Sequence, residues 1–367
     1  MSSPETSESM VPAVDEPLPT GRSRKTAMRR IAGAVVAIVT IVAVFAFLLP
    51  RIADYHDVWA VMSRLSTGEV LALAVATVVN LATYAPPWMA ALPGLGYWQA
   101  TVLTQTSTAI SIAVPGGDAV GLAVSYGMLR SWRYRSSAIA VAVLVTAVWN
   151  QIVNVTLPLI ALVLLLLTGG SSPYLLTAGL IGIGVVVALT VMLVLALRSD
   201  RQARWLGEHA QRVVNWGLHL LRRPLREGWG DASVKFRHET VGLLSRRWPA
   251  ITAAAFLGHL TVFGVLLVCL RVTGVTADQV SWVEAMAAWG LIRLLTAVPI
   301  TPAGVGIVEL GLASALVGFG ASNAEAVAAV LLYRVLTVLP SLVLGAIFGL
   351  TWRRHRAPEP ADVTSGS

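Results

Sequence analysis

The sequence predicts an all-α integral membrane protein with about six full spans and two re-entrant helical hairpins, arranged as an inverted repeat. Of the 367 residues, 56% are hydrophobic, which exceeds the roughly 45–50% apolar content of soluble domains. These residues form long uninterrupted runs. Two further apolar stretches are broken by proline and glycine, and such breaks favour hairpins that are protected inside protein over simple crossings.

Six apolar runs are long enough to cross a hydrocarbon core of roughly 30 Å as helices. The first run follows a long polar tail and precedes no small-residue cleavage site, so we interpret it as an anchor and not as a cleavable signal peptide. The runs are Ile31–Leu49, Val70–Leu92, Ala138–Leu167, Tyr174–Leu197, Ile251–Leu270 and Ala324–Leu350.

The formal net charge of +8 comes from basic residues that are concentrated outside the apolar runs. Most of the 27 Lys and Arg residues lie in segments 22–30, 130–135, 198–247 and 353–356. The positive-inside rule assigns these four segments, and therefore both termini, to the cytoplasmic side of the inner membrane. No groove rich in aromatic and basic residues accompanies the charges, so we expect no nucleic-acid partner.

The chain divides into two tails and one membrane domain. Residues 1–28 and 353–367 lack periodicity and are predicted to be disordered cytoplasmic tails. Residues 29–352 form the polytopic domain, and residues 198–248 within it form a basic cytoplasmic insert. The insert is predicted to contain an amphipathic helix that lies on an anionic membrane surface and ends near Pro224. Its apolar stripe comprises Leu206, Val213, Leu218, Leu221 and Leu225.

Two breaks predict the re-entrant hairpins. The stretch "AVPGGD" separates Trp98–Val114 from Ala119–Leu129, and the second piece is too short to cross the bilayer. We therefore expect a hairpin that enters from the cytoplasmic side. The stretch "VPITPAG" divides Val283–Phe319 in the same way, and this hairpin is expected to enter from outside.

The two broken segments align with each other without a gap. The alignment pairs Pro115 with Pro302 and Gly117 with Gly304. Inverted repeats with broken helices are typical of many transporters, whose sites lie near the midplane where the breaks meet. Chance similarity between two apolar hairpins is the alternative explanation.

Each break also creates a helix N-terminus, where unpaired amides and the helix dipole attract anions. Gly116 and Gly117 precede one half-helix, and Gly304 and Gly306 precede the other. These glycines are candidate substrate-binding positions. Asp118, at the start of the first half-helix, is either an N-cap or a participant in substrate or proton binding.

Three charged residues stand out within the apolar stretches, namely Arg293, Glu309 and Arg334. Charges inside a span are costly and are candidate functional groups. A Glu309–Arg334 ion pair that only holds helices together is one interpretation. The other is that arginine binds an anionic headgroup while Glu309 balances the charge. The first unit has Leu122 and Ala147 at the positions that align with Glu309 and Arg334.

Several uncharged polar residues occur in the same apolar stretches. Each is more readily explained by a hydrogen bond between helices than by a ligand. They are Asn80, Gln105, Asn150, Gln151, Asn154 and His259. The Gly345 and Gly349 pair predicts a close helix contact. The single cysteine, Cys269, excludes a disulfide within the chain, and we interpret it as a buried apolar side chain.

The second half resembles a known family. The segment 299–345, with Pro302, Gly304, Gly306 and Glu309 followed by "YR" at Tyr333 and Arg334, is similar to the membrane domain shared by lysylphosphatidylglycerol synthase/flippases and stand-alone flippase-like proteins. The stretches "PGGDAVGLAVSYGMLRSW" and "VTAVWNQIVNVTLPLIAL" resemble the first half of actinobacterial members. The resemblance covers roughly residues 30–350. It implies the translocating part without the aminoacyl-transferase domain.

The function expected from this resemblance is translocation of a lipid with an anionic headgroup, a phospholipid or a polyprenyl-linked lipid, between membrane leaflets. The alternative is a non-transporting scaffold or accessory subunit of an envelope enzyme, which would then be a partner. An integral-membrane lipid transferase is less favoured, because no metal-ligand spacing, phosphate-binding loop or GxSxG motif is present. We therefore expect no enzymatic activity and no cofactor, and membrane lipids are the expected partners.

Overall fold

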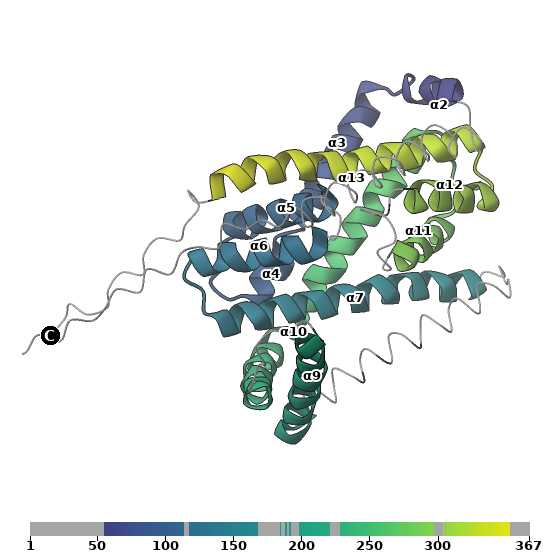
Figure 1. Ribbon diagram of the computed structural model, residues 1–367. Coiled ribbons are helices and arrows are strands. Elements are labelled where there is room, and N and C mark those ends of the chain that lie inside the picture. Colours follow the sequence, from purple (N-terminus) through teal and green to yellow (C-terminus); the bar gives the residue numbers. More distant parts are fainter. Residues whose placement is uncertain are drawn as a thin grey trace, which may run out of the picture.

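The computed structural model is all-helical over the residues that it describes (Figure 1). These are residues 55–113, 117–167, 198–220, 228–296 and 306–352, with the single residues 184, 188, 191 and 304. The helices are α2 (Tyr55–Met62), α3 (Thr67–Ala82), α4 (Pro86–Ala91), α5 (Tyr97–Ala113), α6 (Gly117–Ser131), α7 (Ser136–Leu167), α9 (Asp200–Leu220), α10 (Trp229–Val272), α11 (Trp282–Thr296), α12 (Ile307–Phe319) and α13 (Asn323–Thr351).

Within the described residues, four helical segments are long and apolar enough to cross a membrane. They are Thr67–Ala91, Ser136–Leu165, Trp229–Val272 and Asn323–Thr351, and they confirm four of the six predicted spans. The predicted run at 31–49 and most of the run at 174–197 lie outside the described residues. The chain is therefore a multi-pass membrane protein with at least these four candidate spans.

The predicted span Val70–Leu92 is not one continuous helix. It consists of α3 and α4, which are separated at residues 83–85. Pro86 and Pro87 occupy the first turn of α4, where proline fits best because its missing amide hydrogen would have no partner within the helix. By contrast, Pro249 and Pro340 lie inside the continuous helices α10 and α13.

The helices form one bundle in which the long helices cross one another (Figure 1). α13 packs along α5, α7 packs along α11, and α10 runs across the bundle in contact with α3, α4, α7 and α13. The close approach of α13 to α5 depends on Gly345, since a Cβ atom there would meet Ala109 Cβ and the carbonyl oxygen of Gln105. The predicted glycine contact is confirmed at this position.

Helices end on both sides of the two predicted breaks. α5 and α6 pack against each other, and α11 packs against α12. Gly117 lies so close to α5 that a Cβ atom would collide with the carbonyl oxygens of Ile110 and Ser111. These two helix pairs match the lengths of the predicted pieces. Their re-entrant insertion and their inverted symmetry stay predictions.

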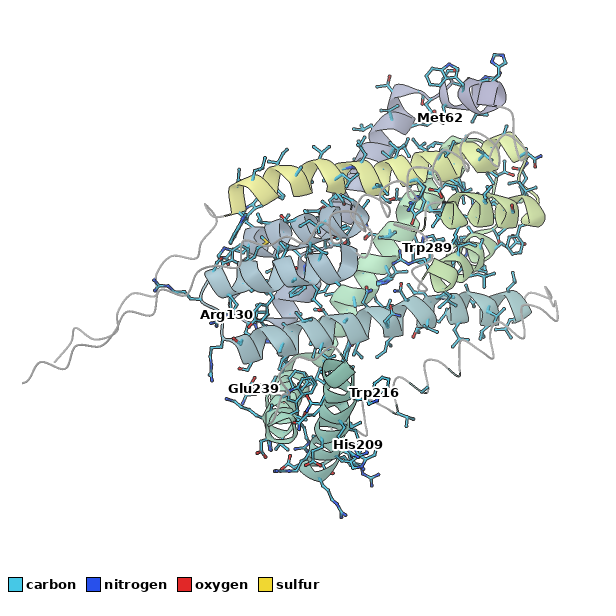
Figure 2. The ribbon with its side chains drawn as sticks, in the orientation of Figure 1. Met62, Arg130, His209, Trp216, Glu239 and Trp289 are labelled. Carbon is cyan, nitrogen blue, oxygen red and sulfur yellow. The ribbon has the colours of Figure 1, made fainter. Side chains whose placement is uncertain are left out.

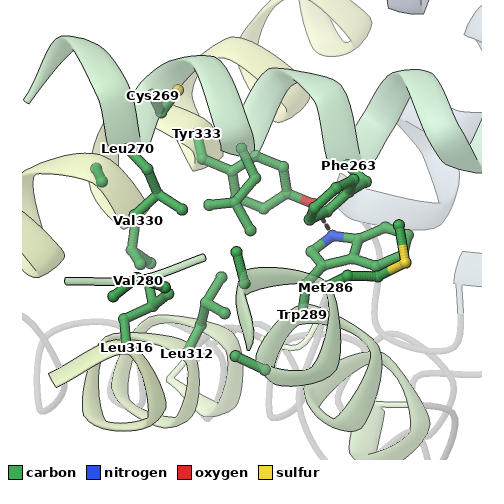
Figure 3. Packing of buried hydrophobic residues seen from close by; sticks show 14 of the residues in the cluster. Phe263, Cys269, Leu270, Val280, Met286, Trp289, Leu312, Leu316, Val330 and Tyr333 are labelled. Carbon is green, nitrogen blue, oxygen red and sulfur yellow. Dashed lines mark hydrogen bonds between the residues drawn. The ribbon is translucent and has the colours of Figure 1, made fainter. Parts of the chain in front are cut away.

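A hydrophobic core packs together α10, α11, α12 and α13 of the second half of the chain (Figure 3). Leu266 and Leu270 of α10 pack there with Leu312 and Leu316 of α12, and all four side chains are fully buried. Cys269 is also buried and free of a disulfide, as predicted. The same core includes Trp289 of α11 and Tyr333 of α13, so it holds together the helices α11, α12 and α13 that carry the three predicted charged residues.

The basic insert forms an antiparallel helix pair that projects from the bundle (Figure 1). α9 packs on the first part of α10, where Gly207 directly contacts Trp229 and Ser233. Ion pairs of 2.6 Å between Arg204 and Asp231 and between Arg237 and Asp200 join the two helices. The predicted helix is therefore present and ends at Leu220. The predicted stop at Pro224 lies outside the described residues.

Candidate binding cavity

A cavity of roughly 630 Å³ lies among the spans. Its volume falls within the range of about 300–1,000 Å³ that is common for ligand pockets. Both halves of the chain contribute to its lining. The polar and aromatic lining residues are Thr83, Tyr84, Trp88, Thr104, Ser107, Thr108, Thr146, Trp149, Asn150, His259, Arg293, Tyr333, Arg334 and Thr337. Two of the three predicted charged residues, Arg293 and Arg334, thus reach one cavity.

The predicted Glu309–Arg334 ion pair is present. Arg334 Nε donates to Glu309 Oε1 over 2.8 Å, and the side chains are 18% and 3% exposed respectively. The other carboxylate oxygen, Oε2, accepts a hydrogen bond of 2.6 Å from the Gly306 backbone amide. Glu309 therefore caps the start of α12 and holds Arg334 at the same time, while only Arg334 lines the cavity.

Arg293 is held by a second set of contacts. Its Nε donates to Asn154 Oδ1 over 3.1 Å, and its guanidinium lies 4.9 Å from the centroid of the Trp289 ring. Such a cation–π contact stabilises a partly desolvated arginine. Trp289 in turn donates from Nε1 to the Tyr333 hydroxyl over 3.0 Å. This hydrogen bond links α11 to α13 next to Arg334. Figure 2 shows Trp289 inside the bundle.

His259 and Asn154 connect α10 to this set. His259 Nε2 lies 2.9 Å from Asn154 Oδ1, and its Nδ1 lies 2.9 Å from the carbonyl oxygen of Ala255. Asn154 therefore contacts both His259 and Arg293. The prediction that these polar residues form hydrogen bonds between helices is confirmed for Asn154 and His259. It is also confirmed for Asn80, which donates to Thr261 over 3.3 Å.

The glycines predicted to bind an anion have other contacts. Gly304 and Gly306 have φ values of 67° and 87°, a left-handed conformation that glycine adopts without strain. The Gly306 amide is bound by Glu309, so it is not presented to a ligand in this structure. Neither glycine, nor Glu309, is among the residues that line the cavity.

The candidate residues of the first half are Gly116, Gly117 and Asp118. Gly116 lies outside the described residues. Gly117 begins α6 and is used for close packing on α5. Asp118 is the second residue of α6, within the first turn and not at the expected N-cap position, and its side chain is outside the part of the chain that the structure describes.

Sequence reasoning missed the hydroxyl-bearing wall of the cavity. Thr104 donates to the carbonyl oxygen of Ala100 over 2.9 Å, and Thr146 donates to that of Ala142 over 2.7 Å. Such bonds within a helix make threonine inconspicuous in an apolar stretch. The signal that could have found this wall is the dense run "TVLTQTSTAIS" in α5. Leu122 and Ala147, which align with Glu309 and Arg334, also line the cavity.

The cavity thus combines two arginines with several hydroxyl-bearing side chains. Guanidinium groups form strong charge-assisted hydrogen bonds with phosphate oxygens, and two of them line this cavity. Hydroxyl groups donate or accept as a ligand requires. The arrangement is suited to holding an anionic polar group away from the surrounding lipid.

The sequence matches a known protein family over most of its length. Residues 31–345 match the family described as the lysylphosphatidylglycerol synthase TM region. No curated protein gives a significant match. The matched range includes every described cavity-lining residue, together with Glu309. The chain therefore belongs to the family of the lysylphosphatidylglycerol synthase transmembrane region.

Proposed function

We propose that this protein translocates a lipid with an anionic headgroup, a phospholipid or a polyprenyl-linked lipid, between the leaflets of the cytoplasmic membrane. One observation carries the proposal. A cavity of roughly 630 Å³ lies among apolar helices and is lined by Arg293 and Arg334. In a dry and closely packed centre, two arginine side chains would each carry the free-energy cost of placing a charge inside a membrane span, without a ligand to offset it.

In the proposed cycle, the headgroup enters the cavity while its acyl or prenyl tails stay in the surrounding lipid. Arg334 is oriented by Glu309, and Arg293 is oriented by Asn154 and Trp289. Because these supports fix both guanidinium groups before the ligand arrives, less side-chain entropy is lost on binding. Rocking of the two predicted repeats would then open the cavity to the opposite leaflet.

No chemical step is included in the proposal, so the protein is not proposed to be an enzyme. Both termini and the α9–α10 helix pair are proposed to be cytoplasmic, because most of the basic residues lie there. An enzyme that makes or consumes the lipid on one side of the membrane is the proposed partner of such a translocator.

The test is leaflet exchange in liposomes that contain the purified protein. Tail-labelled fluorescent phosphatidylglycerol and a labelled polyprenyl phosphate would be followed as the outer leaflet is bleached chemically. We expect exchange by the wild type and a loss of at least about tenfold in Arg293→Gln, since one charged contact to phosphate is removed. The matched control is Arg246→Gln, on the exposed first part of α10, which is expected to exchange lipid as the wild type does.

A second function is favoured by one observation, the fully formed Glu309–Arg334 pair. A closed ion pair is what a non-transporting scaffold for an envelope enzyme would use to hold α12 to α13. If folded wild type exchanges neither lipid, translocation of these lipids is excluded and the scaffold becomes the better proposal. Exchange that is equal in wild type and Arg293→Gln would retain transport but remove the cavity from its mechanism.

A further inference from the structure

We infer that His259 is a proton-binding site of the cavity and that its protonation is linked to the binding of a lipid phosphate. The inference rests on the proposed function and names what accompanies the headgroup. His259 is 7% exposed and lines the cavity from α10. Histidine ordinarily changes its charge between pH 5 and 8, so a histidine that lines a cavity among membrane spans can load and release a proton.

Both ring nitrogens of His259 face oxygen atoms that can only accept hydrogen bonds. Nδ1 lies 2.9 Å from the carbonyl oxygen of Ala255, and Nε2 lies 2.9 Å from Asn154 Oδ1. The neutral ring carries one N–H group and donates in one of these directions, whereas the protonated ring donates in both. The two hydrogen bonds are therefore complete only when His259 carries the additional proton.

Arg293 determines which end of the Asn154 amide faces His259. An asparagine amide can be turned over, which would offer its NH₂ group to the ring instead of its oxygen. Arg293 Nε is a donor, however, and it lies 3.1 Å from the same Oδ1 atom. The turned amide would place two donors against each other. Asn154 therefore presents an acceptor to His259.

The charges around the cavity oppose this proton as long as the cavity is empty. The titratable groups that line it with His259 are Tyr84 between α3 and α4, Arg293 of α11, and Tyr333 and Arg334 of α13. The described lining residues of α5, α6 and α7 carry no titratable group, and the described lining has no aspartate or glutamate. Glu309 reaches this set only through its bond to Arg334. A protonated His259 would thus add a positive charge beside two arginines, which like-charge repulsion disfavours.

A phosphate in the cavity reverses the balance. Its negative charge offsets the charge that a proton adds to His259, and the hydrogen bonds to Ala255 and Asn154 are then both made. Phosphate binding therefore favours proton uptake, and by reciprocity the proton favours phosphate binding. In the proposed cycle the proton crosses with the headgroup. The headgroup charge is then compensated, and a proton gradient can drive the transport.

The first experiment measures proton uptake when a ligand binds to the detergent-solubilised wild-type protein. The probe is dihexanoyl phosphatidylglycerol, because its phosphodiester keeps one negative charge near neutral pH and does not titrate there. Calorimetric titrations in two buffers with different enthalpies of ionisation give the protons taken up per bound lipid. We expect about half a proton at pH 6.5 and close to one at pH 5.5, since an ordinary histidine is about half charged at the higher value. Binding without proton uptake, or no binding of the probe, would overturn the inference.

A substitution of the histidine tests whether the proton is held there. In His259→Gln, the side chain can still donate to Asn154 Oδ1 but cannot become charged. We expect its proton uptake at pH 5.5 to be at least about fivefold below that of the wild type. The matched control is His238→Gln on the exposed first part of α10, which is expected to take up as many protons as the wild type. Equal uptake in both variants would place the proton elsewhere and overturn the inference.

A second variant keeps the histidine and changes its partner. Asn154→Asp retains an oxygen that accepts from His259 and Arg293, but it adds a negative charge that holds the proton before the lipid arrives. We expect its proton uptake at pH 6.5 to fall at least about twofold below the wild-type value. Uptake that matches the wild type in this variant would contradict the linkage between His259 and the bound phosphate.

A pH gradient separates this inference from the proposed translocation. Liposomes that contain the wild-type protein would hold pH 6 on one side and pH 7.5 on the other. We expect tail-labelled phosphatidylglycerol to leave the leaflet at pH 6 at least about fivefold faster than the leaflet at pH 7.5, since the charged fraction of an ordinary histidine differs by roughly that factor. Equal rates from both leaflets would overturn the inference and leave translocation intact. Proton uptake in the calorimeter without any exchange would exclude translocation and retain the proton site.

Discussion

Glu309 makes two contacts with one carboxylate, and these contacts predict how the pair responds to substitution. Glu309→Gln keeps an oxygen that can accept from the Gly306 amide but leaves Arg334 without its carboxylate. Breaking a buried pair on one side costs about 3–5 kcal/mol. We therefore expect a marked fall in the thermal unfolding temperature of the detergent-purified protein, measured by fluorescence.

The double variant Glu309→Gln with Arg334→Met is the control for this prediction. It removes both charges, so it is expected to be more stable than Glu309→Gln alone, since no uncompensated charge is left behind. If the losses of the two single variants simply add in the double variant, the two side chains are not coupled and the ion pair is not what holds α12 to α13.

At the level of single residues, charge was easier to predict than polarity. Arg293, Glu309 and Arg334 stood out because a charge in an apolar stretch needs a reason. The Glu309–Arg334 partnership was predictable because Glu309 is the acidic residue farthest from the ends of the apolar stretches, whereas Glu284 and Glu325 lie near helix starts. The role of Thr104 and Thr146 was not, because a hydroxyl that is bonded within its own helix leaves no pattern in the sequence. The bond from Gly306 to Glu309 was also missed, since it depends on a glycine N-cap.

Contacts between helices depend on glycines that differ sharply in their surroundings, and this difference gives a matched pair of substitutions. Gly345 of α13 faces the backbone of α5, so Gly345→Ala is expected to destabilise the protein by about 1–3 kcal/mol through overpacking. At Gly264 of α10, a Cβ atom would have no neighbouring atom within 4 Å, so Gly264→Ala is expected to be neutral or to stabilise by up to about 1 kcal/mol. Thermal unfolding of both variants in one detergent measures the contrast. Equal losses would mean that α13 and α5 are not in close contact.

The first residues of helices were easier to predict from the sequence than the faces that the helices bury. Ser66 and Glu69 form a capping box before α3, and Ser322 caps α13 by accepting from the Glu325 amide. A serine followed three residues later by glutamate is a readable helix start. The same spacing occurs at Ser281 and Glu284 before α11, where the side chains make the corresponding hydrogen bonds.

The orientation of the amphipathic helix α9 could not be predicted in the same way. The sequence pattern assigns its apolar stripe to the membrane surface, but Ala203 and Leu206 face a small cavity shared with α7 and α10. Trp205 and Trp216 (the latter labelled in Figure 2) are instead 55% and 74% exposed. A helix with apolar residues on two faces can bury either one. Gly207 permits the close approach of α10, because a Cβ atom there would collide with Ser233 Oγ and the carbonyl oxygen of Trp229.

The architecture of the whole molecule was predictable to the extent that it follows from length and hydropathy. Four of the predicted spans correspond to helices of the structure, because a run of about 20 apolar residues has few other uses. The arrangement of those helices was not predictable, since the ridges and glycines that decide which helices touch are spread over the whole chain. That one cavity collects Arg293, Arg334 and the threonines of α5 and α7 emerged only from the packing.

The orientation of the molecule in the membrane is the last prediction. α10 is a single helix of 44 residues that connects the basic helix pair to the loop after Val272. Its apolar part, Ile251–Leu270, is about 30 Å long at 1.5 Å per residue, which is long enough for its two ends to lie on opposite sides of a bilayer. The positive-inside rule assigns the basic end to the cytoplasm. We therefore expect Ala232 to be cytoplasmic and Ala277 to be external.

Single cysteines at these two exposed positions measure the orientation, in a Cys269→Ala background that removes the one native thiol. A membrane-impermeant maleimide should label Ala277→Cys in intact cells and Ala232→Cys only after the cells are permeabilised. The opposite pattern would invert the protein in the membrane. Labelling of both positions in intact cells would mean that α10 does not span the membrane. Either result would require the cavity to be assigned anew, because α10 contributes His259 and Ala255 to its lining.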